Sequence, residues 1–355
     1  MENDKGARGL GLWEKYLTLW VFLCIIAGIA LGRIFPGLST ILSRLEIANV
    51  SIPIAICLFW MIYPIMVQID FRRVVVASKT PKPIATTLIA NWAIKPFTMA
   101  FFAWLFLSVV FKNLIPHDTA LEYRAGMILL GVAPCTAMVL MWSYLAKGNM
   151  AHTLVMCAVN SLSMVVLYAP LAGFLLGVSG ISIPWATIAF SVLIYICIPL
   201  AAGYLTRSIS IKRRGLGWFN KRVVTPLKTV SVIALLVTLI LLFALQGHVI
   251  ISLPGAIGMI TIGIFANILV VFVLTYIIAR IIGIGYEDAA PSAIIAGSNH
   301  FEVAIAVATT LFGIKSGAAL ATVVGVLTEV PMMLFIVWLC KRTKWFFHKN
   351  VNSQI

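Results

Sequence analysis

Charged residues are scarce in this chain, and acidic residues are the scarcest of them. Of 355 residues, 10% are charged and only 11 are aspartate or glutamate, whereas 62% are hydrophobic. A soluble domain carries roughly 25% charged residues, so the composition excludes a soluble globular fold. The net charge of +15 could indicate nucleic-acid binding, but the basic residues lie mainly between long apolar runs, where such charges orient membrane spans. We expect an all-α polytopic membrane protein without a nucleic-acid partner.

Several enzyme and pump signatures are also missing. The six cysteines show neither C-x-x-C spacing nor a metal-binding pattern, so we expect no disulfide framework and no metal cluster. The chain has no phosphate-binding loop, no dinucleotide fingerprint and no segment long enough for an ATPase domain. The longest inner connection that we expect, residues 207–222, is read as a loop. We therefore expect no cofactor and no ATPase subunit, and an ion gradient has to supply the energy.

Long apolar runs fill most of the chain. Runs of roughly 17 to 25 residues are long enough for a membrane-spanning helix. Ten such runs are predicted, at Tyr16–Ile34, Ala48–Val67, Pro83–Val110, Arg124–Ala146, Ala151–Leu176, Pro184–Thr206, Val224–Gln246, Gly255–Arg280, Pro291–Leu311 and Gly317–Leu339.

The positions of lysine and arginine predict the orientation. With the N-terminus in the cytoplasm, the inner segments carry 20 of the 26 basic residues, and the outer segments carry five. Inner loops of membrane proteins are enriched in lysine and arginine. We therefore expect a multi-pass protein of the cell membrane, in contact with the lipid bilayer, with both termini cytoplasmic.

Ten spans divide into five and five, and a second copy of an odd-numbered unit must enter the membrane in the opposite direction. This predicts two inverted five-helix repeats. The domain boundaries that we expect are 1–15 for a cytoplasmic N-terminal segment, 16–176 for the first repeat, 177–340 for the second repeat and 341–355 for a basic cytoplasmic tail.

Two short polar interruptions lie inside apolar runs, at matching places in the two halves. The first is Ala-Pro-Cys-Thr at 133–136, and the second is Gly-Ser-Asn-His-Phe-Glu at 297–302. Lipid offers no partner for a thiol, an amide or a carboxyl group, so such residues occur where protein or water surrounds them. Paired broken spans are the sequence feature that best indicates the central site of a secondary transporter.

Proline dominates the first interruption. Pro134 removes a backbone donor and disfavours helix at Ala133, so the helix should kink or unwind there. We place Cys135 and Thr136 at the start of the second half-helix, whose partial positive charge favours a thiolate. This makes Cys135 a candidate ligand for a thiophilic substrate. An inert buried cysteine beside an ordinary proline kink explains the same residues equally well.

The second interruption combines helix-weakening residues with groups that need partners. Gly297 and Ser298 weaken the helix, and Asn299 and His300 require hydrogen bonds. Glu302 lies near the middle of the run, where a carboxyl group suits proton coupling or cation binding; a structural role for it is the alternative. Ser298 and Asn299 are candidate substrate contacts, and His300 is a second candidate for proton transfer.

Four further polar residues lie inside apolar runs. Lys95 and Glu329 are too deep to reach the membrane surface easily, and Lys95 could neutralise either Glu302 or Glu329. We expect structural or supporting roles for both. The other two residues in this supporting group are amides, Asn91 and Asn160.

Motifs around these residues resemble those of a known family. They are Asn-Trp-Ala-Ile-Lys-Pro-Phe at 91–97, Gly-Val-Ala-Pro-Cys-Thr-Ala-Met-Val at 131–139, Ser-Asn-His-Phe-Glu-Val-Ala-Ile-Ala at 298–306 and Glu-Val-Pro at 329–331. Over nearly its whole length the chain resembles the arsenite efflux permeases, a branch of the bile acid/arsenite/riboflavin transporter superfamily. The Ala-Pro-Cys-Thr-Ala-Met run is the most specific of these motifs, and Asn-x-Phe-Glu is a looser one.

The resemblance implies a fold and a site. It implies a core domain with crossed, broken fourth and ninth spans, and a panel domain of the first, second, sixth and seventh spans. It also implies that the essential thiol is Cys135 and the essential carboxyl group is Glu302. At His300 relatives commonly have asparagine, so a role that needs an amide is not expected there.

These observations predict a secondary active transporter that extrudes arsenite by antiport with protons and confers arsenic resistance; antimonite is a further candidate substrate. Trivalent arsenic is soft and prefers sulfur, so we place arsenic(III) at Cys135, where a single thiol binds it reversibly. The main alternative is a sodium-coupled symporter of an organic anion, with Glu302 and Asn299 at a sodium site. A membrane receptor is a further alternative, but it would need a soluble output domain, which this sequence does not contain. An enzyme with Cys135 as the nucleophile would need a supporting base, and we find none in place.

Overall fold

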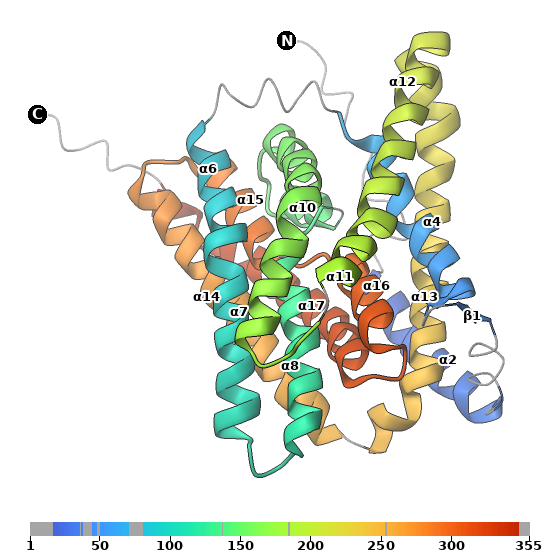
Figure 1. Cartoon of the computed structure of the whole chain (residues 1–355). Coiled ribbons are helices and arrows are strands. Elements are labelled where there is room, and N and C mark those ends of the chain that lie inside the picture. The colour runs from blue at the N-terminus through green and yellow to red at the C-terminus, as the bar shows by residue number, and fades with distance from the viewer. Residues whose placement is uncertain are drawn as a thin grey trace, which may run out of the picture.

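The computed structural model describes residues 17–35, 37, 45–47, 50–70, 81–136, 138–183, 185–252 and 254–347. Helices make up nearly all of this part of the chain (Figure 1). The exception is a short antiparallel pair of two-residue strands, β1 (Glu46–Ile47) and β2 (Val50–Ser51). The predicted N-terminal segment 1–15 and residues 348–355 of the predicted tail lie outside the described residues.

Helical segments lie in each of the apolar runs. In the first half these are α2 (Leu17–Ile34), α4 (Ile52–Gln68), α6 (Pro81–Ile89), η2 (Ala90–Ile94), α7 (Lys95–Trp104), η3 (Leu105–Val110), α8 (His117–Val132), α9 (Val139–Leu145) and α10 (Met150–Val178). In the second half they are α11 (Trp185–Val192), η4 (Leu193–Cys197), α12 (Ile198–Phe219), η5 (Asn220–Val224), α13 (Thr225–Ser252), α14 (Pro254–Ile281), α15 (Tyr286–Gly297), α16 (Phe301–Phe312), α17 (Gly317–Arg342) and η6 (Lys344–Phe347).

Among the described residues, five helical stretches are long and apolar enough to cross a membrane: 81–110, 150–178, 185–245 (interrupted at Gly215), 254–281 and 317–342. Many large hydrophobic side chains face outward, including Phe22, Val166 and Ile233. A soluble monomer rarely exposes so much contiguous apolar surface. The all-helical, polytopic membrane fold predicted from composition is therefore confirmed, whereas the inverted repeat stays a prediction.

Three short π-helical turns precede a proline by two residues. They are η2 before Pro96, η4 before Pro199 and η5 before Pro226. Proline lacks the N–H that an α-helix needs and clashes with the carbonyl four residues earlier, and a wider π turn relieves this conflict. The η2 turn matters most, because Asn91 lies in it and Lys95 follows it, and both side chains are fully buried.

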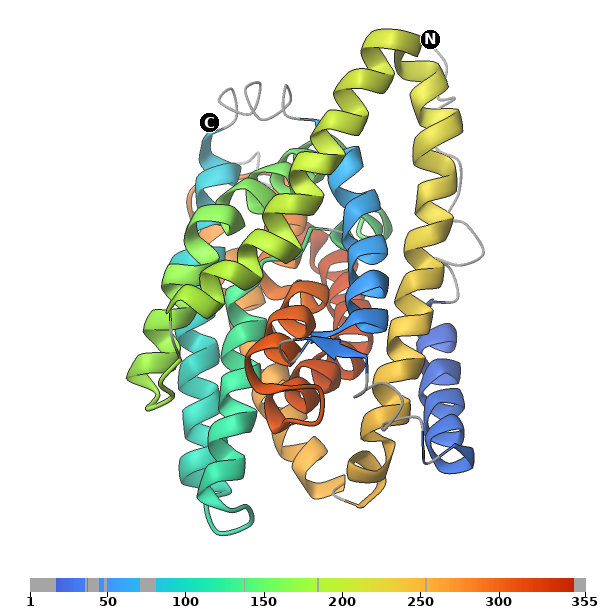
Figure 2. The ribbon, with the colours of Figure 1, turned by 45° about the vertical axis from the view of Figure 1, so that its right-hand side comes forward.

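The prediction of a loop at residues 207–222 is wrong. Helical backbone fills most of this segment: α12 extends to Phe219 with a non-helical break at Gly215, and η5 leads directly into α13. Lysine and arginine are good helix formers, so a basic segment continues the helix as readily as it forms a loop. Gly215, with φ of 78°, marks the bend. The two helices extend together beyond the rest of the molecule at the top of Figure 2.

The helices pack in two groups. In one group α13 packs against α2 and α4, and α12 packs against α4. In the other group α8 packs against α7 and α17, and α14 packs against α7, α15 and α17. Figure 1 shows the first group along the right-hand side and the second group to its left. The polar interruptions lie in the second group.

Close packing within the second group depends on small residues. A β-carbon at Gly126 of α8 would collide with the backbone carbonyl of Ala318 at the start of α17. Small residues let helices approach closely in lipid, where van der Waals contact and not water exclusion drives association. This contact sets how α17, which carries Glu329, lies against the broken helix.

Candidate functional site

The two polar interruptions meet at the centre of the second group. Helix α8 ends at Val132 and α15 ends at Gly297, and the chain becomes extended at Ala133 (φ −93°, ψ 101°) and at Ser298 (φ −86°, ψ 149°). Pro134 and Asn299 form an antiparallel bridge, and the His300 amide donates to the Ala133 carbonyl at 2.8 Å. Each break thereby satisfies backbone groups that the other has lost, as a backbone inside a membrane requires.

Lys95 ties the two breaks together from a third helix. Its side chain is fully buried, and Nζ donates to the Ser298 carbonyl at 2.8 Å and to the Ala133 carbonyl at 3.4 Å. Its electrostatic neighbours are Cys135 and Glu329. Among the described residues no ion pair joins Lys95 to a carboxylate. The direct partners of Lys95 are thus the two backbone carbonyls.

Glu329 holds the second break from α17. Its Oε1 accepts hydrogen bonds from Ser298 Oγ at 2.5 Å and from the Asn299 amide at 3.0 Å. The side chain is 1% exposed. One carboxylate oxygen therefore replaces a helical carbonyl at the point where α15 stops.

Cys135 lies in the extended segment and not in a helix. Its carbonyl accepts a hydrogen bond from Asn160 Nδ2 at 3.1 Å, and Asn91 Nδ2 in turn donates to Asn160 Oδ1 at 3.1 Å. Helix α9 begins only at Val139. The prediction that Cys135 and Thr136 start the second half-helix is wrong, because the opposite break and Asn160 bind this backbone before a helix can form.

The Cys135 side chain is 2% exposed and belongs to a small apolar cluster. The other buried members of this cluster are Val139, Met156, Cys157 and Ile295. None of the six cysteines takes part in a disulfide. Burial keeps this thiol from bulk water, and sulfur is the ligand that a soft, thiophilic substrate prefers.

Glu302 lies in the first turn of α16 with His300 beside it. Its side chain is 4% exposed, and a carboxylate in the first turn interacts favourably with the helix dipole. His300 Nδ1 lies 3.0 Å from Glu302 Oε2, but the pair is not aligned as a hydrogen bond. The contact brings together the two residues proposed from sequence for proton transfer.

Several buried polar atoms at the crossing lack a hydrogen-bond partner among the described residues. They are Thr136 Oγ1, both side-chain polar atoms of Asn299, His300 Nε2 and Asn91 Oδ1. About 90% or more of buried polar groups in proteins are satisfied. A cluster of unsatisfied groups on two paired breaks is what a binding site for a small polar ligand requires.

The structure adds residues that the sequence reasoning did not select. Thr98 lies one helical turn after Lys95 on α7, and its Oγ1 donates to Asn267 Oδ1 on α14 at 2.7 Å. Asn267 is a lone amide inside an apolar run, so the rule that selected Asn160 could have found it. His152 Nε2 lies 3.0 Å from Ser292 Oγ, but its position at the end of a run gave no signal.

The profile of the Sodium Bile acid symporter family matches residues 55–253. The chain is 52% identical to an uncharacterised transporter of Synechocystis sp. over 98% of this chain and 93% of that protein. It is 45% identical to the arsenical-resistance protein Acr3 of Alkaliphilus metalliredigens, over 96% of this chain and 95% of the relative.

A second Acr3, from Corynebacterium glutamicum, is 34% identical over 94% of this chain and 90% of its own length. These relatives are named as transporters or resistance proteins, and the family is one of transporters, which agrees with the expectation that the chain is not an enzyme. The chain is a multi-pass membrane transporter of the sodium bile acid symporter family and belongs to its arsenite efflux permease branch, which the Acr3 proteins represent.

Proposed function

We propose that this transporter exports arsenite from the cytoplasm in exchange for protons and so confers arsenic resistance. The observation that carries the proposal is the placement of Cys135 in an unwound, buried segment that pairs directly with the break preceding Glu302. The names of the two Acr3 relatives support arsenic as the substrate. Antimonite, which is similarly thiophilic, is a further candidate substrate.

The chemistry at Cys135 is a reversible ligand exchange. Neutral As(OH)3 reacts with the thiol to form a sulfur–arsenic bond, and one arsenic hydroxyl leaves as water with the thiol proton. Hydrolysis of the same bond regenerates the thiol and As(OH)3. Because only one sulfur binds, arsenic can leave again, as transport requires. Thr136, Ser298 and Asn299 are placed on the two breaks to hydrogen-bond the remaining hydroxyls.

Glu302 couples this exchange to protons. In its ionised form it accepts a hydrogen bond from an arsenic hydroxyl. On the outer side a proton taken up by Glu302 competes with that hydrogen bond and favours release, and the proton is lost to the cytoplasm on return. We assign the transfer of this proton to His300, whose Nδ1 lies 3.0 Å from Glu302 Oε2.

Alternating access requires the two helix groups to move relative to each other. Cys135, Thr136, Asn299 and Glu302 are all buried, so a path has to open on one side at a time. We assign α2, α4, α12 and α13 to a panel domain and the other group to a core domain that carries the site. We further propose ten spans in two inverted repeats, 16–176 and 177–340, with both termini cytoplasmic.

Arsenite accumulation in everted membrane vesicles tests this proposal. Everted vesicles whose lumen has been acidified, so that protons flow outward, should accumulate arsenite, and a protonophore should abolish the accumulation. Replacing sodium with choline in the buffer should leave arsenite accumulation unchanged. Arsenite uptake that persists with the protonophore, or that needs sodium, would contradict proton antiport.

A sodium-coupled symporter of an organic anion is the second candidate, and the description of the matched family favours it. In that case Glu302, Asn299 and the carbonyls freed at the breaks would hold sodium. The Cys135 thiol argues against it, because sodium is a hard cation that prefers oxygen and gains nothing from sulfur. Sodium-dependent uptake of a bile acid, with no arsenite transport, would support this alternative.

A further inference from the structure

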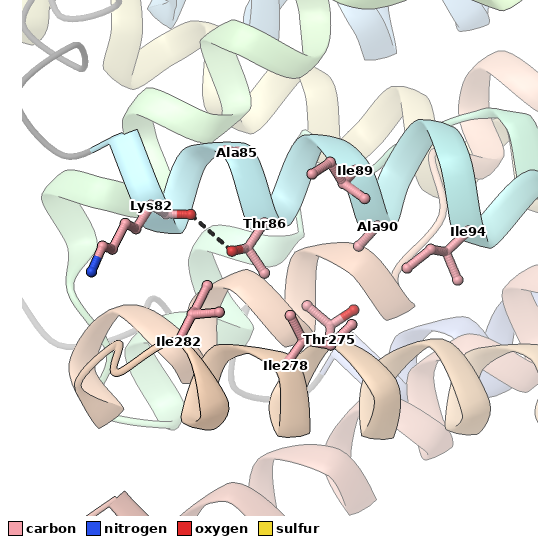
Figure 3. A pocket seen from close by; sticks show the side chains of 9 residues that line it. All are labelled: Lys82, Ala85, Thr86, Ile89, Ala90, Ile94, Thr275, Ile278 and Ile282. Atoms are coloured by element: carbon pink, nitrogen blue, oxygen red, sulfur yellow. Dashed lines mark hydrogen bonds between the residues drawn. The ribbon is translucent and has the colours of Figure 1, made fainter.

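A narrow groove runs along the exposed surface between α6–η2 and α14, and none of the candidate substrate-site residues lines it. Its volume is about 350 Å³. Figure 3 shows side chains from the two helices on either side of it. The lining residues are Lys82, Ala85, Thr86, Ile89, Ala90, Ile94, Thr275, Ile278 and Ile282.

The groove has the length of one membrane leaflet. On its first wall the lining residues run from Lys82 to Ile94 at spacings of one to four along a single helical stretch. Twelve residues of helix rise about 18 Å, and half of the hydrocarbon core of a bilayer is about 15 Å thick. An acyl chain that begins at the Lys82 end would therefore reach the middle of the bilayer near Ile94.

The chemistry of the lining selects an apolar occupant. Thr86 Oγ1 donates to the Lys82 carbonyl at 2.8 Å, and Thr275 Oγ1 donates to the Val271 carbonyl at 2.7 Å. Both hydroxyls thus donate within their own helices. Small side chains, Ala85 and Ala90, leave the space that a chain of methylene groups can fill.

One end of the groove is positively charged. Lys82 is exposed in the first turn of α6, at the end near Ile282 (Figure 3), and none of the described residues that line the groove is acidic. Further basic residues lie in the last turns of α14 (Arg280) and α17 (Lys341 and Arg342), and Arg280 Nε donates to the Phe346 carbonyl of η6. A lysine at the membrane surface, with its stem along apolar surface, attracts an anionic headgroup.

We propose that this groove binds one acyl chain of an anionic phospholipid, whose phosphate contacts Lys82. The bound lipid joins α6 to α14 at the surface. Both η2 and α14 contact α15, the half-helix that leads into the second break, so the lipid also supports the arrangement of the site. This inference does not depend on the identity of the transported substrate.

Native mass spectrometry of the full-length protein tests the proposal. Released from membranes that contain equal amounts of phosphatidylglycerol and phosphatidylcholine, the protein should retain one phosphatidylglycerol. Lys82→Gln should weaken its retention about fivefold, the effect of one basic residue near a membrane surface. Ala85→Phe, which fills the groove at an exposed position, should abolish retention.

Two matched variants control for charge and bulk. Lys112→Gln removes a charge at the other end of the same helical hairpin, and Ala201→Phe adds the same bulk at an exposed site on α12; neither should change retention. Equal retention of both lipids by the wild type, or an equal loss from Lys82→Gln and Lys112→Gln, would overturn the proposal. Unchanged retention in both Lys82→Gln and Ala85→Phe would overturn it as well.

Discussion

Pro134 and Asn299 form an antiparallel backbone bridge where two broken helices meet. A proline offers only its carbonyl to such a bridge, so the neighbouring His300 amide supplies the hydrogen bond, to Ala133, at 2.8 Å. The bridge makes one rigid unit of segments from opposite halves of the chain. It also links the segment that carries the Cys135 thiol to the segment that leads into the helix of Glu302.

The Lys95 ammonium should be needed to hold this unit together. Lys95→Met removes the Lys95 donor from the Ser298 carbonyl and leaves the Ala133 carbonyl with the His300 amide, and losing a buried hydrogen bond to a charged group costs about 1.5–3 kcal/mol. Thermal unfolding in detergent should show this loss. Lys228→Met, at an exposed position of α13, is the control and should unfold like the wild type. Equal stability of both variants would show that Lys95 does not tie the breaks.

Glu329 should act through its acceptor oxygen. In Glu329→Gln the amide oxygen can still accept from Ser298 Oγ and the Asn299 amide, so stability should fall by no more than about 1 kcal/mol. Glu329→Ala removes the acceptor and should cost about 2 kcal/mol or more. The same unfolding measurement compares the two variants. A glutamine variant as unstable as the alanine variant would mean that the negative charge, and not the acceptor, holds the break.

Glu302 and His300 should differ in importance. Glu302→Gln should abolish arsenite accumulation at every pH, because the neutral amide can no longer exchange a proton. His300→Asn should keep at least about half of the transport, since the contact with Glu302 is not an aligned hydrogen bond. Glu287→Gln, an exposed acid at the start of α15, is the control. Proton-driven uptake by Glu302→Gln would exclude Glu302 as the coupling group.

The contact between α8 and α17 should tolerate no side chain at Gly126. Gly126→Val places a branched side chain against the Ala318 carbonyl, and overpacking typically costs about 1–3 kcal/mol. Gly177→Ala is the matched control, because nothing lies within 4 Å of its new methyl group. Reduced thermal stability of the valine variant alone is the expected result. Equal melting temperatures of the two variants would mean that α8 and α17 can move apart to fit the valine side chain without losing stability.

Much of the fold follows from local sequence. Apolar length predicts the membrane helices, and Pro134 and Gly297 predict the two breaks, because each acts on its own helix. The pairing of Pro134 with Asn299 is a tertiary contact that no local pattern encodes. The same holds for Lys95: its depth was evident from sequence, but its partners are carbonyls of two distant segments.

Two errors have the same physical origin. A loop is predicted at residues 207–222 because they lie between two apolar runs, yet the backbone is helical on both sides of Gly215. Cys135 was placed at a helix start because it follows a proline, yet the opposite break binds that backbone first. In both cases the local structure depends on which partners the backbone N–H and C=O groups find. The chemistry of the side chains in the segment does not reveal those partners.

The role of Cys135 is the central claim, and one pair of variants tests it most directly. Cys135 and Cys157 are buried in the same apolar cluster, on the break and on α10 respectively. Arsenite accumulation in energised everted vesicles should be abolished by Cys135→Ala and should remain near the wild-type level in Cys157→Ala. Full accumulation by a well-folded Cys135→Ala variant would contradict the account, because arsenic would then cross the membrane without this thiol.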